Sequence, residues 1–129
     1  MVEWDAHVDS ERRPTVYIVD RDDAVRDSLS AFLETAGYET YGFAACAQFL
    51  SIHRIPARSC LLLDFQLPRH GGNERLACLA RHVRELPVIV MSGAARYTEA
   101  RSLQAGASAF IEKPVDSDEL IGALHKVFG

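Results

Sequence analysis

Four polar residues follow apolar runs at widely separated points of the chain. Asp20 comes after "VYIV", Asp64 after "CLLL", Ser92 after "VIVM", and Lys113 after "AFIE". A carboxylate can act as a nucleophile or bind a cation, and hydroxyl and ammonium groups can donate hydrogen bonds to oxyanions. Phosphoryl transfer needs this set, because its transition state spreads negative charge over equatorial oxygens. If the fold brings them together, these residues predict a site for phosphoryl chemistry.

The elements that must position these residues are read from the apolar pattern. Short runs rich in apolar and β-branched residues predict strands over 15–19, 38–43, 60–64, 87–92 and 109–111. Helical spacing predicts helices over 23–36 and 45–52, through Leu76, Leu79 and Ala80, over 97–105, and from Asp116 onward. Gly37 and Gly106 are placed as C-terminal stops.

Acidic residues are placed to begin two of these helices. Asp22 or Asp23 is expected to cap the first helix, because a carboxylate before a helix accepts bonds from its first N–H groups. Asp116, with Glu119 three residues later, has the spacing of a capping box.

Strands that alternate with helices predict an α/β fold, with a parallel sheet covered by helices on both faces. In such sheets the active crevice lies outside the carboxyl ends of the strands. Asp20, Asp64, Ser92 and Lys113 each fall at or just beyond such an end. We therefore expect the four side chains to converge on one edge of the sheet.

Composition restricts the class of protein. The 129 residues predict one domain over 15–129 after a loose extension over 1–14, and the net charge of -4 argues against a dedicated nucleic-acid binder. No apolar run is long enough to cross a bilayer, and the acidic N-terminus lacks the apolar centre of a signal peptide. Three widely spaced cysteines without a CxxC pair argue against a disulfide framework or a zinc site. We expect a cytoplasmic protein.

The motifs together resemble the receiver domain of response regulators in two-component signalling. The matches are "IVD" ending at Asp20, Asp64-x-x-x-Pro68-x-x-x-Gly72, "VIVMSG" with Ser92, and "FIEKP" with Phe110, Lys113 and Pro114. In motif the chain is closest to receivers of nitrogen-fixation-type regulators, which usually carry a LuxR-type DNA-binding domain. The resemblance implies a flavodoxin-like, doubly wound five-stranded parallel sheet with strand order 2-1-3-4-5. Because the sequence ends just after its last predicted helix, we expect no DNA-binding domain and no direct contact with nucleic acid.

The resemblance also implies a role for each site residue. Asp64 would accept a phosphoryl group from a histidine kinase as an acyl phosphate. Lys113 would pair with one phosphoryl oxygen, and Ser92 would donate a hydrogen bond to another. Pro114 would hold the lysine loop through a cis peptide bond, which proline makes accessible. Phe110 would turn inward when Ser92 moves, and the alternative is that it is a static core aromatic.

A magnesium ion is the cofactor that the resemblance implies. Its ligands would be Asp20, Asp64 and the backbone carbonyl of Gln66. Asp22 is a further candidate, because the family's usual second acid, directly after Asp20, is here replaced by Arg21.

Arg21 changes the charge balance of the predicted pocket. Asp20 and Asp64 face Arg21 and Lys113, so the pocket is neutral before any metal arrives. A divalent ion and a guanidinium about 5 Å apart repel by roughly 7 kcal/mol at an effective dielectric near 20. We therefore expect weakened magnesium binding. One hypothesis is that Arg21 bridges the two carboxylates as a built-in cation, and the other is that it points into water.

Three functions remain open at this point. The first is a phosphorylation-controlled signalling module. It is expected not to be an enzyme, apart from phosphorylating itself from donors and slowly losing the phosphoryl group. The loss is expected to be slow because Ala94 has no group that could orient an attacking water. It would dimerise or bind a protein target through the helix over 97–105, the strand over 109–111 and the final helix. The second is a degenerate receiver, a protein-binding module without magnesium-dependent phosphorylation. The third is a small phosphatase or haloacid-type hydrolase using Asp64. The absence of a second acid two residues after Asp64, where Gln66 stands, counts against it.

Overall fold

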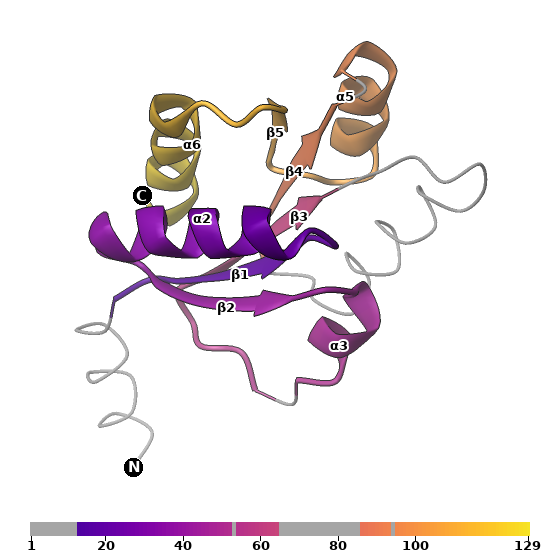
Figure 1. Ribbon diagram of the computed structural model, residues 1–129. Helices are drawn as coiled ribbons and strands as arrows, with labels where there is room; N and C mark the ends of the chain where they lie inside the picture. The colour runs from indigo at the N-terminus through magenta and orange to yellow at the C-terminus, as the bar shows by residue number, and fades with distance from the viewer. Residues whose placement is uncertain (1–12, 53, 65–85, 94) are drawn as a thin grey trace.

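The computed structural model describes residues 13–52, 54–64, 86–93 and 95–129, whose strands form one parallel sheet (Figure 1). The strands are β1 (Thr15–Val19), β2 (Glu39–Phe43), β3 (Ser59–Asp64), β4 (Val88–Ser92) and β5 (Ala109–Glu112). Their order across the sheet is β2-β1-β3-β4-β5, and each neighbouring pair is parallel. The predicted flavodoxin-like strand order is confirmed.

Helices cover both faces of this sheet. They are α2 (Asp23–Thr35), α3 (Cys46–Leu50), α5 (Ala95–Gln104) and α6 (Ser117–Phe128). Leu33 of α2 and Leu124 of α6 belong to one core cluster with Ile18 and Leu62, so both helices cover the same face of the sheet. Phe49 of α3 belongs to the core of the other face. Because both faces are covered, the central strands are buried and apolar along most of their length, with polar residues only at their ends.

The ends of the first helix agree with the sequence pattern. Asp22 is its N-cap, and its carboxylate accepts hydrogen bonds from the backbone N–H groups of Ala24 and Val25 at 2.9 and 3.2 Å. Gly37 follows with a φ of +102°, a left-handed conformation that favours glycine at a helix end. The predicted cap and stop are both confirmed.

Two details of the later helices differ from the prediction. α5 begins at Ala95, two residues before the predicted start at 97. Asp116 is the N-cap of α6, but its side chain makes no capping hydrogen bond, so the predicted capping box is wrong. Asp116 and Glu119 are both exposed, and water can satisfy the first N–H groups of an exposed helix end. The helix predicted through Leu76 lies outside the described residues.

Within the described residues no helix combines the length and the apolar character that a membrane span requires.

Cys60 is fully buried in β3, and this burial raises the pKa of its thiol to about 12. Cys60 is therefore a core residue rather than a reactive thiol.

Candidate functional site

Lys113, the first residue after β5, contacts carboxylates at the ends of two other strands. Its Nζ atom lies 2.9 Å from Asp20 Oδ2 and 2.8 Å from Asp64 Oδ1. The side chains of Asp20 and Asp64 are 2% and 4% exposed, and that of Lys113 is 24% exposed. The parallel order of β1, β3 and β5 brings three of the four candidate residues to the same edge of the sheet.

Burial and neighbouring charges change the proton affinity of both partners. The pKa of Asp64 is raised, chiefly by burial and further by Asp20, while Lys113 and Arg21 act in the opposite direction. Burial acts to lower the pKa of Lys113, but its contacts with Asp64 and Asp20 together outweigh burial and raise it. Lys113 therefore carries its positive charge at neutral pH, next to a carboxylate that is costly to ionise.

The acids that follow Asp20 have structural partners of their own. The Asp22 backbone N–H donates to Asp20 Oδ1 at 2.9 Å, while the Asp22 carboxylate caps α2. Asp23 forms an ion pair with Arg26, one turn along the same helix. Asp22 as a magnesium ligand stays a prediction, and it would have to compete with the capping bonds.

Arg21 is exposed, and among the described residues it forms no ion pair with either carboxylate. The hypothesis that Arg21 bridges Asp20 and Asp64 is wrong, because Lys113 makes both contacts. A long side chain at the surface keeps its charged end hydrated, which accounts for this position. The charge of Arg21 still acts on the pocket, because it helps to lower the pKa of Asp64.

The remaining candidate residues lie near this pocket or outside the described residues. Ser92, 2% exposed at the end of β4, accepts a hydrogen bond from the Lys113 backbone N–H through its carbonyl at 2.9 Å. The Lys113–Pro114 peptide bond is cis, as predicted. Phe110 in β5 is half-buried and packs on the core cluster that contains Phe49. Gln66, Pro68, Gly72 and Ala94 lie outside the described residues.

The chemistry of the two carboxylates fits a magnesium ion. Magnesium is commonly held by one or two carboxylates together with waters, and Asp20 and Asp64 already converge on a single cation. Asp64 Oδ1 is buried and has no aligned hydrogen-bond donor among the described residues, although Lys113 Nζ lies 2.8 Å away. The described residues contain no group of three acidic, histidine or cysteine side chains that could hold a metal. Among the described residues a metal would draw on these two carboxylates and would have to share them with the ammonium of Lys113.

Sequence reasoning missed one residue of this region, Arg26. Its Nη1 donates a hydrogen bond to the backbone carbonyl of Asp20 at 2.5 Å, in addition to the ion pair with Asp23. The spacing of Asp23 and Arg26, three residues apart on a helix, could have indicated the ion pair. It could not have indicated the contact with Asp20, which depends on how the helix leaves the strand.

Comparison with known proteins places this chain in a family. Residues 16–125 match the family described as the response regulator receiver domain. The chain is 32% identical over 117 residues to the response regulator protein TodT of Pseudomonas putida, covering 90% of this chain and 52% of TodT. It is 34% identical over 115 residues to the transcriptional regulatory protein FixJ of Azorhizobium caulinodans, covering 88% of this chain and 54% of FixJ. The chain spans about half the length of the curated relatives that it matches.

Solved structures agree with this relationship. The crystal structure of FixJ-N superposes with a TM-score of 0.77 at 29% identity, covering 90% of this chain and 94% of FixJ-N. A response regulator receiver protein from Pseudoalteromonas atlantica gives a TM-score of 0.76 at 27% identity, covering 88% of this chain and 96% of that one. The family match over most of the chain and the similarity to these solved structures agree. This chain belongs to the response regulator receiver domain family.

Proposed function

We propose that this domain is the phosphoacceptor of a cytoplasmic two-component system, phosphorylated on Asp64 by a histidine kinase. The observation that supports it most directly is the contact of Lys113 with two buried carboxylates, Asp20 and Asp64. Burying two acids close together costs free energy of folding unless a cation neutralises their charge. Here one lysine neutralises part of the charge and stands beside the proposed acceptor oxygen.

The proposed reaction transfers a phosphoryl group between two nucleophiles. An oxygen of the Asp64 carboxylate attacks the phosphorus atom of a phosphohistidine. A P–O bond forms, the P–N bond breaks, and the leaving imidazole nitrogen keeps the electron pair. Lys113 then pairs with a phosphoryl oxygen, and the Ser92 hydroxyl donates a hydrogen bond to another. Because Lys113 is charged and already in contact with Asp64, little rearrangement is required.

Magnesium, when bound, would be held by Asp20, Asp64 and the carbonyl of Gln66, and it would neutralise charge on the phosphoryl oxygens. The exposed guanidinium of Arg21 and the ammonium of Lys113 both oppose a divalent ion in this pocket. We therefore expect magnesium affinity to be weak. This expectation favours a second candidate function, a receiver that binds protein partners without magnesium-dependent phosphorylation.

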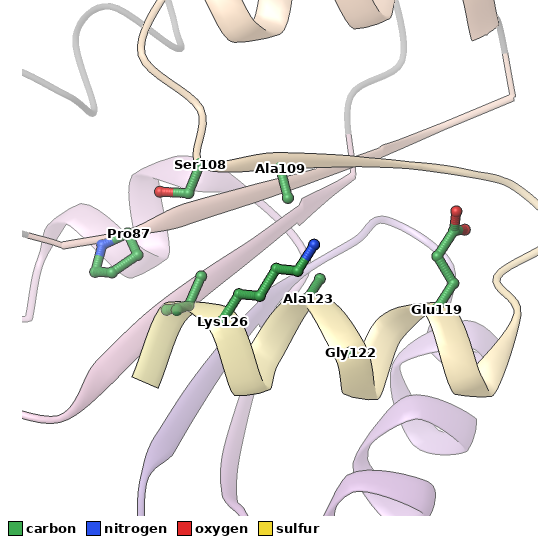
Figure 2. A pocket seen from close by; sticks show the side chains of 8 residues that line it. Pro87, Ser108, Ala109, Glu119, Gly122, Ala123 and Lys126 are labelled. Atoms are coloured by element: carbon green, nitrogen blue, oxygen red, sulfur yellow. The ribbon is translucent and has the colours of Figure 1, made fainter. Parts of the chain in front are cut away.

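The surface formed by α5, β5 and α6 is the proposed output face. Figure 2 shows a groove beside α6, with Lys126 and Glu119 rising from the helix and Ser108 and Ala109 opposite. The groove has a volume of about 560 Å³. The small side chains of Gly122 and Ala123 on α6 leave this space open. β5 is an edge strand of the sheet, so a partner can approach this surface without displacing another strand. A second copy of the domain or a downstream protein is the proposed partner.

Incubation with a small-molecule phosphodonor and magnesium, followed by intact mass measurement, tests the proposed function. The wild-type domain should gain the mass of one phosphoryl group. Asp64→Asn should gain none, and Asp27→Asn, the same chemical change at an exposed position of α2, should behave as wild type. A folded wild-type domain that gains no mass at any magnesium concentration would favour the partner-binding receiver instead.

A further inference from the structure

Asp20 is unusual because each of its polar atoms has a named partner. Its backbone N–H donates to the Phe43 carbonyl at 3.0 Å, and its carbonyl accepts from Arg26 Nη1 at 2.5 Å. Its carboxylate accepts from the Asp22 backbone N–H through Oδ1 and from Lys113 through Oδ2, both at 2.9 Å. These contacts fix both the backbone and the side chain of a residue that is 2% exposed.

The contact from Arg26 satisfies a carbonyl that the sheet cannot reach. β1 ends at Val19, whose partners are Phe43 in β2 and Leu63 in β3, so the carbonyl of Asp20 lies beyond the paired ladder. A buried carbonyl without a donor costs free energy, and the chain would turn to find water. Because the carbonyl and the carboxylate belong to one residue, such a turn would also move the carboxylate away from Lys113.

The surroundings of Arg26 hold its guanidinium in place. Asp23 pairs with one end of the planar fork, while the other end reaches the Asp20 carbonyl. The aliphatic stem runs past Gly42 of β2, where an added Cβ atom would lie 3.4 Å from Arg26 Cδ. A glycine therefore leaves room for the stem, and a larger side chain at position 42 would displace it. The Arg26 side chain is 18% exposed, so it is mostly enclosed by these contacts.

We propose that Arg26 is a positioning residue, which fixes the turn after β1 so that the Asp20 carboxylate faces Lys113 and keeps this lysine bound in the pocket. Its functional meaning rests on the proposed phosphorylation of Asp64, because the same carboxylate and lysine would serve that reaction. The contacts themselves are independent of phosphorylation. Arg26 acts through Asp20 and touches neither Asp64 nor the reacting atoms.

Lysine reactivity tests this proposal without any phosphorylation step. The sequence contains two lysines, Lys113 and the exposed Lys126, so the second is an internal reference. The protein is treated briefly with an amine-acylating reagent at neutral pH, and the ratio of Lys113 to Lys126 labelling is measured by peptide mass spectrometry. Asp20→Asn, which removes one carboxylate from Lys113, should raise the ratio several-fold and calibrates the assay.

Arg26→Ala is expected to raise the labelling ratio several-fold, because the Asp20 carboxylate is no longer held against Lys113 and the freed Nζ atom becomes more accessible to the reagent. Arg26→Lys, which can reach the carbonyl with a single ammonium, should give a smaller rise. Gly42→Leu keeps the arginine but displaces its stem, so it should act like Arg26→Ala. Gly42→Ala, whose added Cβ makes an ordinary contact, should match wild type.

Thermal unfolding establishes that each variant is folded at the labelling temperature. If Arg26→Ala is unfolded at the labelling temperature, the labelling ratio of Gly42→Leu tests the proposal instead. A wild-type ratio in folded Arg26→Ala or Gly42→Leu, together with a raised ratio in Asp20→Asn, would overturn the proposal. Absence of phosphorylation in the wild-type protein would contradict the proposed function but would leave the labelling ratios unaffected, so the two failures are distinguishable.

Discussion

Lys113 Nζ lies 2.8 Å from Asp64 Oδ1, so the residue after the edge strand β5 neutralises the carboxylate at the end of the central strand β3. The same ammonium contacts Asp20 Oδ2, at the end of β1. One cation thus joins three strands at the carboxyl edge of the sheet. The positive charge of this lysine offsets part of the cost of burying two carboxylates close together.

Replacement of Lys113 should therefore lower stability in a pH-dependent way. Lys113→Met leaves Asp20 and Asp64 buried without their cation, and breaking a buried pair in this way costs about 3 kcal/mol at neutral pH. The pKa of Asp64 is already raised by burial, and the loss of Lys113 should raise it further. A folded-state carboxyl with a raised pKa binds its proton more tightly than the unfolded chain, so the variant should regain stability as pH falls.

Urea unfolding of wild type and Lys113→Met at about pH 8 and about pH 5 measures this difference. The free energy of unfolding of Lys113→Met should fall further below that of wild type at the higher pH. Lys126→Met is the matched control, because Lys126 is exposed and lies away from both carboxylates. An equal deficit at both pH values would show that the carboxylates do not depend on Lys113 for their charge.

Arg21 should set the magnesium affinity of the pocket. Arg21→Asp removes a positive charge next to Asp64 and adds a carboxylate, so calorimetry should show magnesium binding strengthened about tenfold. Arg54→Asp makes the same charge change at an exposed site away from the pocket and controls for net charge. Equal affinity in wild type and Arg21→Asp would mean that the charge of Arg21 is fully screened by solvent.

Cys60 should resist alkylation in the folded protein. It is 0% exposed, and burial raises the pKa of its thiol to about 12, so almost no thiolate is present at neutral pH. The half-buried Cys46 is the comparison within the same chain. Peptide mass spectrometry after brief iodoacetamide treatment should find Cys46 modified well before Cys60, and rapid native-state modification of Cys60 would indicate that β3 opens.

The groove beside α6 should affect self-association if it is the output face. Gly122→Leu would fill it, whereas Gly122→Ala adds one methyl group into open space and should chiefly stabilise the helix, by about 1 kcal/mol. Arg101→Glu reverses an exposed charge in α5, on the same proposed face. Analytical ultracentrifugation with and without phosphodonor should show weaker association for Gly122→Leu and Arg101→Glu only. Identical monomers for all proteins would exclude a homodimer through this groove.

The sequence was sufficient for the sheet and for the convergence of its polar ends. Apolar runs with an acid, hydroxyl or lysine after them recur at strand ends, and parallel order then determines where Asp20, Asp64 and Lys113 meet. The position of Arg21 could not be predicted, because two hypotheses with different solvation of the guanidinium fit the same sequence. The Arg26 contact was missed for a related reason. It depends on how the chain turns from β1 into α2 and on the room that Gly42, which has no side chain, leaves for the arginine stem. Both depend on packing, which the spacing of residues in the sequence does not reveal.

The account depends most directly on Asp64 as the phosphorylated residue. Borohydride reduces an aspartyl phosphate to homoserine, so reduction after incubation with phosphodonor and magnesium marks the acceptor in a stable form. Peptide mass spectrometry should then find homoserine at position 64 and aspartate at positions 20, 22 and 23, with no homoserine in untreated protein. Homoserine at another aspartate, or a phosphoryl adduct that survives in Asp64→Asn, would contradict the account.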